Sequence, residues 1–132
     1  MDVTVKNIMT EIVVCAKLDY SVRELMRIMD KENIHCVPII DTRGHCIGIV
    51  SGADLIRWHK TQKRSDDVYA HEVLSHPVTT VAPEVTLLGA VKLMVSKNIH
   101  HLVVLNKQEL IGIVSVMDVL EHFVQKEEAS DR

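Results

Sequence analysis

The chain repeats itself, and this duplication constrains its fold more than any other feature of the sequence. The cassette GIVSGAD at 48–54 returns as GIVSVMD at 112–118. The tripeptide Asn-Ile-His at 33–35 returns at 98–100, and the opening KNIMTEIVV at 6–14 aligns with HEVLSHPVT at 71–79. Because these blocks keep their order, the 132 residues predict two copies of one structural unit.

Each copy is predicted to contain the same elements in the order β-α-β-β-α. A short apolar run over 12–16 or 78–81 favours the first strand, and an amphipathic helix follows it. Ser21 and Thr86 are the predicted N-caps of these helices, and Glu24 completes a capping box where the second copy has Gly89. The apolar residues of each helix share one face: Val22, Leu25, Met26 and Met29, then Leu87, Ala90, Val91 and Met94.

Two further strands and a short helix complete each copy. Strands are predicted over 35–40 and 46–50 around the turn DTRG, and again over 101–105 and 110–114. The closing helices are predicted from Ala53 to about Trp58 and from Met117 to about Phe123. The expected domains are a first repeat at 5–60, a linker at 61–70, a second repeat at 71–124 and a fraying polar tail at 125–132.

The size of each repeat indicates how the two copies associate. A unit of about 60 residues buries its own apolar face poorly when it stands alone. We therefore expect an α/β (α+β) fold whose two repeats pack sheet to sheet about a pseudo-twofold axis. Two related clefts would then lie between the repeats.

Composition and charge exclude several classes of function. The formal net charge of −3 disfavours a nucleic-acid binder, and the short apolar runs disfavour membrane insertion. The N-terminal residues carry charges where a signal peptide has its apolar core, so we expect a cytoplasmic protein. Three cysteines without CxxC spacing, Cys15, Cys36 and Cys46, indicate reduced thiols rather than disulfides or a zinc site.

The duplicated cassette carries the chemistry most suggestive of a binding site. Ser51 and Ser115 are predicted at strand-to-helix junctions, where free backbone N–H groups and a positive helix end favour an anion. Asp54 and Asp118 fall in the first turn of each helix, and a carboxylate accepts hydrogen bonds from the vicinal hydroxyls of a ribose. The glycine three residues before each serine allows another backbone or a flat ring to approach closely.

The same pattern has a purely structural alternative. Ser-x-x-Asp before an apolar run is also a capping box, which explains each pair without any ligand. Duplication would preserve a cap as readily as a binding site. Both interpretations remain open at the level of residue pattern.

The paired motifs resemble those of the cystathionine-β-synthase (CBS) domain family. The resemblance rests on NIHCVPIID with GIVSGADL and on NIHHLVVLN with GIVSVMDV, and it covers roughly 5–124. It implies a stand-alone Bateman module, in which two repeats bind AMP, ADP, ATP or adenosylmethionine in the clefts between them. It further implies a homodimer that controls an effector protein in trans, without catalytic activity and without a required cofactor.

The resemblance also implies roles for individual residues. Ser51 and Asp54 would bind phosphate and ribose in one cleft, and Ser115 and Asp118 would do so in the other. Val103 and Cys15 depart from the other copy, which has Pro38 and Thr80 at those positions. The implied adenine pocket and its surroundings comprise Thr10, Val13, Val14, Val37, Pro38, Ser75, Val78, Thr79, His101, Leu102 and Val103.

Two rival functions are weighed against the nucleotide sensor. The first is a ligand-independent dimerisation or protein-interaction module, in which the Ser-x-x-Asp pairs are only caps. The second is a metal or redox sensor that uses the eight histidines and three cysteines, although no metal-ligand spacing supports it. Catalysis has no support, because the sequence offers no nucleophile with a base and an orienting partner.

Overall fold

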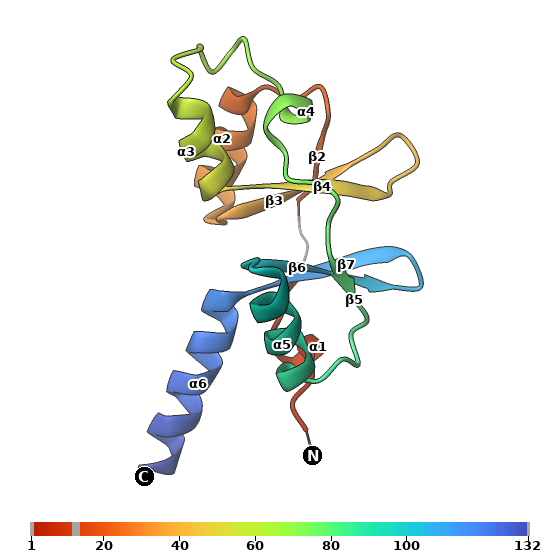
Figure 1. Ribbon diagram of the computed structural model, residues 1–132, viewed down its shortest axis with the longest axis vertical. Coiled ribbons are helices and arrows are strands. Elements are labelled where there is room, and N and C mark those ends of the chain that lie inside the picture. Colours follow the sequence, from red (N-terminus) through yellow and green to blue (C-terminus); the bar gives the residue numbers. More distant parts are fainter. Residues whose placement is uncertain (1, 12–13, 132) are drawn as a thin grey trace. The chain divides into compact units, whose positions relative to one another are not determined.

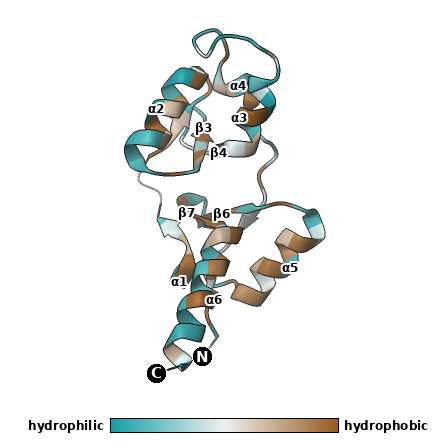
Figure 2. Cartoon of the chain, turned by 90° about the vertical axis from the view of Figure 1, so that its left-hand side faces the viewer, coloured by the Kyte–Doolittle hydropathy of each residue, from teal (hydrophilic) through white to brown (hydrophobic). Residues whose placement is uncertain are grey.

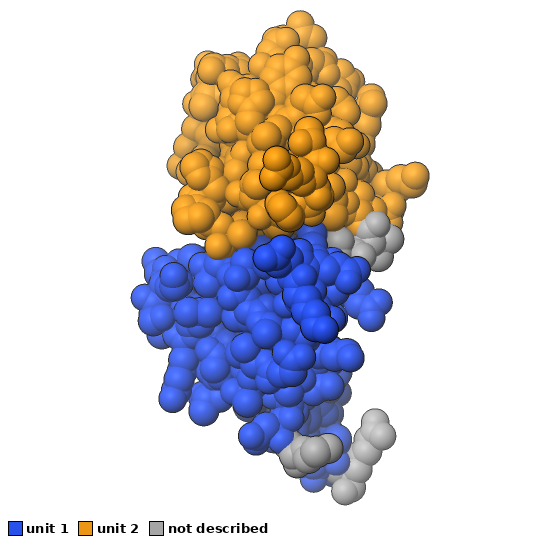
Figure 3. All heavy atoms as spheres, turned by 90° about the vertical axis from the view of Figure 1, so that its right-hand side faces the viewer, with its two compact units in different colours: residues 1–12, 79–132 blue, residues 13–78 orange. Residues whose placement is uncertain are grey.

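The computed structural model describes residues 2–11 and 14–131, which form two compact units. Unit 1 comprises Met1–Ile12 and Thr79–Arg132, and unit 2 comprises Val13–Val78 (Figure 3). The units cut across the sequence repeats, because the opening segment of each repeat belongs to the unit that contains the body of the other repeat. Both units contain mixed helix and sheet, so the expected α/β (α+β) class is confirmed.

Unit 2 is a three-stranded sheet with helices on one face (Figure 1). The strand order is β2-β3-β4, in which β2 runs parallel to β3 and β3 runs antiparallel to β4. The elements are β2 (Ala16–Lys17), α2 (Val22–Glu32), β3 (Cys36–Ile40), β4 (Cys46–Ser51), α3 (Gly52–His59) and α4 (Ala70–Val73).

Unit 1 repeats this arrangement and adds one strand. The strand order is β1-β7-β6-β5, with β5 parallel to β6 and the other pairs antiparallel. The elements are α1 (Val5–Ile8), β1 (Thr10–Glu11), β5 (Thr80–Val81), α5 (Leu87–Lys97), β6 (His101–Asn106), β7 (Glu109–Ser115) and α6 (Val116–Ser130). The predicted order β-α-β-β-α is therefore confirmed in both repeats.

Each unit has its own hydrophobic core between sheet and helices. Alternation along the strands directs every second side chain toward the helices. Figure 2 shows much of α5 as hydrophobic, whereas α2 presents a more hydrophilic surface. The buried core residues are Ala16, Leu25, Val37, Ile39, Val50 and Ala70 in unit 2, and Val5, Val81, Ala90, Met94, Leu102, Val104 and Val114 in unit 1.

The helix ends explain two of the repeated sequence blocks. The Ser21 hydroxyl accepts a hydrogen bond from the backbone N–H of Glu24 at 3.1 Å, and the Thr86 hydroxyl accepts one from Gly89 at 3.1 Å, so both predicted caps are confirmed. Asn33 and Asn98 end α2 and α5 in the left-handed conformation, each with φ 52°. Asparagine tolerates this conformation at a helix end, which accounts for its return in both Asn-Ile-His blocks.

The opening strands are shorter than predicted. They begin only at Ala16 and Thr80, where parallel pairing with β3 and β6 starts. The predicted runs at 12–16 and 78–81 each include the point where the chain passes from one unit to the other. Residues 12 and 13 lie outside the described residues.

The sequence-based helix predictions need three corrections. The short helices α1 and α4 were not predicted. Met26 is 44% exposed, because the buried stripe of α2 is centred on Val22 and Leu25. Helix α6 continues to Ser130 instead of ending near Phe123, since Gln, Lys, Glu and Ala at 125–129 are strong helix formers and no Gly or Pro interrupts them. Within the described residues, no helix combines the length and the apolar character needed to cross a membrane.

Candidate functional site: two Ser/Thr–Asp clusters

In unit 2 the segment after α4 crosses β4 next to the repeated cassette. The Ser75 N–H donates to the Ile49 carbonyl with an N to O distance of 2.8 Å, and the Ile49 N–H donates to the Ser75 carbonyl at 3.1 Å. A Cβ at Gly48 would meet the side chain of Leu74 and would lie 3.0 Å from the Ser75 carbonyl oxygen. The expected close approach at this glycine is therefore made by the protein's own backbone.

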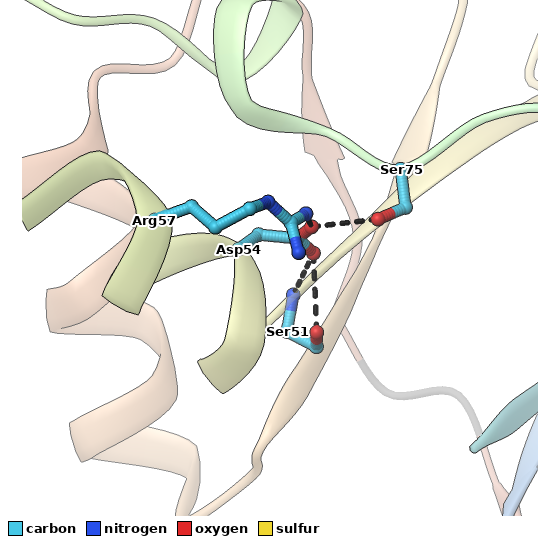
Figure 4. Close-up of polar contacts among 4 residues, drawn as sticks. All are labelled: Ser51, Asp54, Arg57 and Ser75. Atoms are coloured by element: carbon cyan, nitrogen blue, oxygen red, sulfur yellow. Dashed lines mark hydrogen bonds and ion pairs between the residues drawn. The ribbon is translucent and has the colours of Figure 1, made fainter. Parts of the chain in front are cut away.

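This crossing brings Ser75 to the carboxylate of Asp54. We call Ser51, Asp54, Arg57 and Ser75 the Asp54 cluster (Figure 4). The Ser51 N–H and hydroxyl donate to Asp54 Oδ2 at 2.8 and 3.1 Å, and the Ser75 hydroxyl donates to Oδ1 at 2.6 Å. The Arg57 guanidinium forms an ion pair with Oδ1 from one turn further along α3.

The Asp54 carboxylate is saturated by protein donors. A carboxylate offers about four lone-pair positions, and four donors from the protein occupy them here. Asp54 is only 2% exposed, and Arg57 supplies the opposite charge that such burial requires. A ribose could reach Asp54 only by displacing at least one of these donors.

Unit 1 contains an equivalent but more open arrangement. We call Thr10, Ser115 and Asp118 the Asp118 cluster. The Thr10 hydroxyl donates to Asp118 Oδ1 at 3.2 Å across 108 positions of sequence, and the Ser115 N–H donates to Oδ2 at 2.8 Å. The Asp118 N–H in turn donates to the Ser115 hydroxyl at 3.1 Å, which completes a reciprocal capping box.

The Asp118 carboxylate retains acceptor capacity. Two hydrogen bonds reach it, from the Thr10 hydroxyl and the Ser115 N–H, both uncharged donors, and the residue is half-buried. Glu121 stands on α6 where Arg57 stands on α3, and it is exposed. Because residues three apart on a helix are neighbours, Glu121 adds negative charge beside Asp118 where Arg57 neutralises Asp54.

The strand residue opposite each serine also differs between the clusters. Cys36 faces Ser51 in the register of β3 and β4, whereas His101 faces Ser115 in that of β6 and β7. Burial raises the pKa of Cys36 to about 12, and the nearby charges of Asp54 and Cys46 contribute to this shift. The Cys36 thiol is therefore protonated at neutral pH and is a weak nucleophile and metal ligand.

The other two thiols behave similarly. All three cysteines are free, and burial raises the pKa of both Cys15 and Cys46. The described residues contain no group of three or more His, Cys, Asp or Glu side chains arranged to hold a metal ion.

The predicted pocket residues occupy several environments. Val37 and Leu102 lie in the two hydrophobic cores, whereas Pro38 and Val103 are buried outside those clusters. Val14, Val78 and Thr79 are half-buried, and the Thr79 carbonyl accepts from the Val103 N–H at 2.9 Å. Val13 lies outside the described residues.

Sequence reasoning missed the residues that distinguish the two clusters. Arg57 and Glu121 were not singled out, although each follows its aspartate by three positions on a helix. That spacing puts two side chains on one helical face and is readable from sequence. Thr10 and Ser75 were named only through the family resemblance, and their contacts with Asp118 and Asp54 were not predicted.

The comparisons with known proteins agree on one family. The model of the CBS domain matches residues 5–60 and 70–125. The CBS domain-containing protein YhcV of Bacillus subtilis is 25% identical over 126 residues, which cover 96% of this chain and 89% of the relative. An uncharacterized protein of Methanopyrus kandleri is 37% identical over 95 residues, 70% of this chain, but this match spans only 48% of that relative.

A solved structure extends the likeness to three dimensions. It is the CBS domain pair of protein MJ0100 in complex with 5′-methylthioadenosine and S-adenosyl-L-methionine, with a TM-score of 0.84 and 24% sequence identity. The alignment covers 96% of this chain and 99% of that one. With the twin cassettes, the duplicated fold and a family model matched twice, the chain belongs to the CBS domain family and contains a pair of CBS repeats.

Proposed function

We propose that the protein is a regulatory module that binds an adenosyl ligand (AMP, ADP, ATP or adenosylmethionine) at its two Ser/Thr–Asp clusters. Each cluster takes residues from both sequence repeats, so ligand binding would couple the two repeats. Membership of the CBS family and the duplication of the cluster support this proposal. No catalytic step and no required cofactor form part of it.

The open acceptor positions of Asp118 are the observation that carries the proposal. The ribose 2′- and 3′-hydroxyls would donate to this carboxylate, beside the Thr10 hydroxyl. The first N–H groups of α6 and the Ser115 hydroxyl lie at the same helix end, where an electron-rich group of the ligand would find hydrogen-bond donors. The adenine would pack on apolar residues in or next to the strands, for which Val14, Pro38 and Val78 are the candidates in unit 2 and Val103 in unit 1.

The Asp54 cluster would bind the ligand by exchanging the hydrogen-bond donors of Asp54. The ribose hydroxyls would replace Arg57 and Ser75, whose contacts with Asp54 are drawn in Figure 4, as donors to this carboxylate. The remaining candidates of both pockets are Val13, Val37, Thr79, His101 and Leu102. The 5′-methylthioadenosine and S-adenosyl-L-methionine named for MJ0100 define suitable probes, although at 24% identity that structure establishes only a shared fold.

Regulation would be exerted on another protein. A ligand that favours one conformation of the module shifts its population toward that conformation. This would change the surface that the module presents to an effector protein. We include a homodimer and an effector in trans in the proposal. A cytoplasmic setting also belongs to it, supported by three free thiols, which persist in a reducing compartment.

Calorimetric titration of single-site variants tests the proposal. Wild-type protein, Asp118→Asn, Asp54→Asn and the double variant are titrated with AMP and with 5′-methylthioadenosine, and Asp30→Asn on the exposed face of α2 is the control. A lost hydrogen bond to a charged group costs about 1.5–3 kcal/mol. Replacing an aspartate that contacts the ribose should therefore weaken binding roughly tenfold to a hundredfold. Wild-type affinity in the double variant would exclude the assigned ribose contacts.

One observation favours a second candidate function. The Asp54 carboxylate is fully satisfied within the protein, and Ser115 with Asp118 forms a complete capping box. A ligand-independent dimerisation or protein-interaction module needs nothing more than this. That alternative predicts partner binding that is unaffected by any nucleotide.

A further inference from the structure

The two clusters are equivalent in position but differ in charge, and the proposed function does not use this difference. The Asp54 cluster contains one carboxylate and one guanidinium, so its charges cancel. The Asp118 cluster has the Glu121 carboxylate where that guanidinium would be, so two negative charges lie within one helical turn. A ligand that carries phosphate therefore meets a neutral ion pair at one cluster and two negative charges at the other.

We infer that the residue three positions after each aspartate sets the charge of the ligand that each cluster accepts. Arg57 makes the Asp54 cluster selective for a nucleotide with a 5′-phosphate, and Glu121 makes the Asp118 cluster selective for an adenosyl compound without phosphate. This inference rests on the proposed function and adds to it the class of ligand for each cluster.

Exchange of hydrogen-bond partners explains the selectivity at Asp54. A ribose that binds Asp54 must displace the Arg57 guanidinium from Oδ1. The displaced guanidinium is left without a counter-ion unless the ligand brings one, and a phosphate accepts it in a strong charge-assisted pair. The Arg57 side chain is 64% exposed and forms an ion pair with Asp54, so its guanidinium can be reached by a phosphate from solvent.

Repulsion explains the opposite selectivity at Asp118. The Thr10 hydroxyl and the Ser115 N–H are uncharged donors to this carboxylate, so a ribose that exchanges with them releases no arginine. A phosphate on the same ligand would come close to both Asp118 and Glu121, and like charges in proximity oppose binding. A neutral thioether or a sulfonium in place of the phosphate avoids that repulsion.

Reversing the charge at residue 57 or 121, in variants that keep only one intact cluster, tests the inference. Asp118→Asn isolates the Asp54 cluster and Asp54→Asn isolates the Asp118 cluster, and each is titrated with AMP and with 5′-methylthioadenosine. The first should prefer AMP and the second should prefer 5′-methylthioadenosine, each by roughly tenfold or more. Adding Arg57→Glu to the first and Glu121→Arg to the second should reverse these preferences.

Matched controls separate local from general charge effects. Arg23→Glu on α2 and Glu127→Arg on α6 make the same changes at exposed positions outside both clusters, and neither should change a preference more than about twofold. The milder Arg57→Gln and Glu121→Gln variants should abolish each preference, and circular dichroism and thermal unfolding verify that all variants are folded.

The outcomes distinguish a failure of the inference from a failure of the proposed function. Preferences that follow residues 57 and 121 support the inference. Aspartate-dependent binding whose preference ignores both residues overturns it and leaves the proposed function intact. Absence of binding of either probe by wild-type protein freed of bound nucleotide overturns the proposed function together with the inference.

Discussion

At the scale of single residues, Cys36 reports on the electrostatics of the Asp54 cluster. Its thiol lies opposite Ser51 in the sheet, and burial together with the charge of Asp54 raises its pKa to about 12. The unfolded thiol ionises near its ordinary value of 9.0. The folded protein therefore holds this proton over a pH range in which the unfolded chain releases it.

This shift predicts how stability depends on alkaline pH. Below about pH 9 both states hold the proton, so the contribution of Cys36 to stability is complete. As the pH rises from 9 toward 12, the unfolded state is favoured by ionisation and the free energy of unfolding falls. Urea unfolding at pH 8 to 11 should show a steeper loss for wild type than for Cys36→Ala. Equal slopes would show that Cys36 ionises normally in the folded protein.

Gly48 provides a residue-scale test of the strand crossing. An added Cβ would collide with Leu74 and lie 3.0 Å from the Ser75 carbonyl, whereas one at Gly52 would meet nothing within 4 Å. We expect Gly48→Ala to lower the free energy of unfolding by about 1–3 kcal/mol and Gly52→Ala to be neutral or slightly stabilising. Equal stability of the two variants in urea would contradict the packing described.

At the scale of elements, the sequence is most informative where the signal is local. The caps Ser21 and Thr86, the helical face of α5 and the paired strands β3–β4 and β6–β7 follow from nearby residues, so they are predictable. The short strands β1, β2 and β5 depend on where the chain changes units. The contact of Thr10 with Asp118 joins residues 108 positions apart, and no local pattern encodes it.

Helix α6 exposes an apolar stripe that the closing helix of the other repeat does not share. Val116, Met117, Leu120, Phe123 and Val124 are each at least 37% exposed, and the equivalent α3 positions are Gly52, Ala53, Ile56, His59 and Lys60. The stripe follows one helical face over most of α6. Within the proposed homodimer, we assign this stripe to the contact between two copies.

Charge in the middle of the stripe should disrupt that dimer. Phe123→Glu is expected to convert a dimeric wild type to monomer in light scattering, because a carboxylate cannot be buried unpaired against the second copy. Val95→Glu, at an exposed apolar position on α5, is the matched control and should remain dimeric. A dimeric Phe123→Glu variant would exclude α6 as the contact.

At the scale of the whole molecule, the exchange of opening segments ties the two repeats together. In unit 2 the Val22 N–H donates to the Val68 carbonyl at 2.8 Å and the Ala70 N–H donates to the Tyr20 carbonyl at 2.7 Å. A chain cut at the sequence repeat would lose both bonds and the Ser75 contact with Asp54. We therefore expect the compact unit 13–78, rather than the sequence repeat 5–60, to fold as a unit.

Two fragments of similar length test this division. A fragment of 13–78 retains the core of unit 2, whereas a fragment of 1–65 lacks Val68, Ala70 and Ser75. Both are marginal in size, so the comparison is relative. We expect 13–78 to unfold cooperatively in circular dichroism and 1–65 to show no cooperative transition. The reverse order would contradict the exchange of segments.

The central claim is that the folded protein binds an adenosyl ligand, and thermal unfolding with a ligand panel tests it most directly. The panel contains AMP, ADP, ATP, NAD, 5′-methylthioadenosine, adenosylmethionine and GTP, applied to protein from which any bound nucleotide has been extracted by unfolding and refolding. A ligand at about 100 times its dissociation constant adds about 2.7 kcal/mol, which raises the Tm of a domain of this size by several degrees. The account predicts such a shift with at least one adenosyl compound, its loss in the Asp54→Asn/Asp118→Asn double variant, and none with GTP. An unchanged Tm across the whole panel would contradict it.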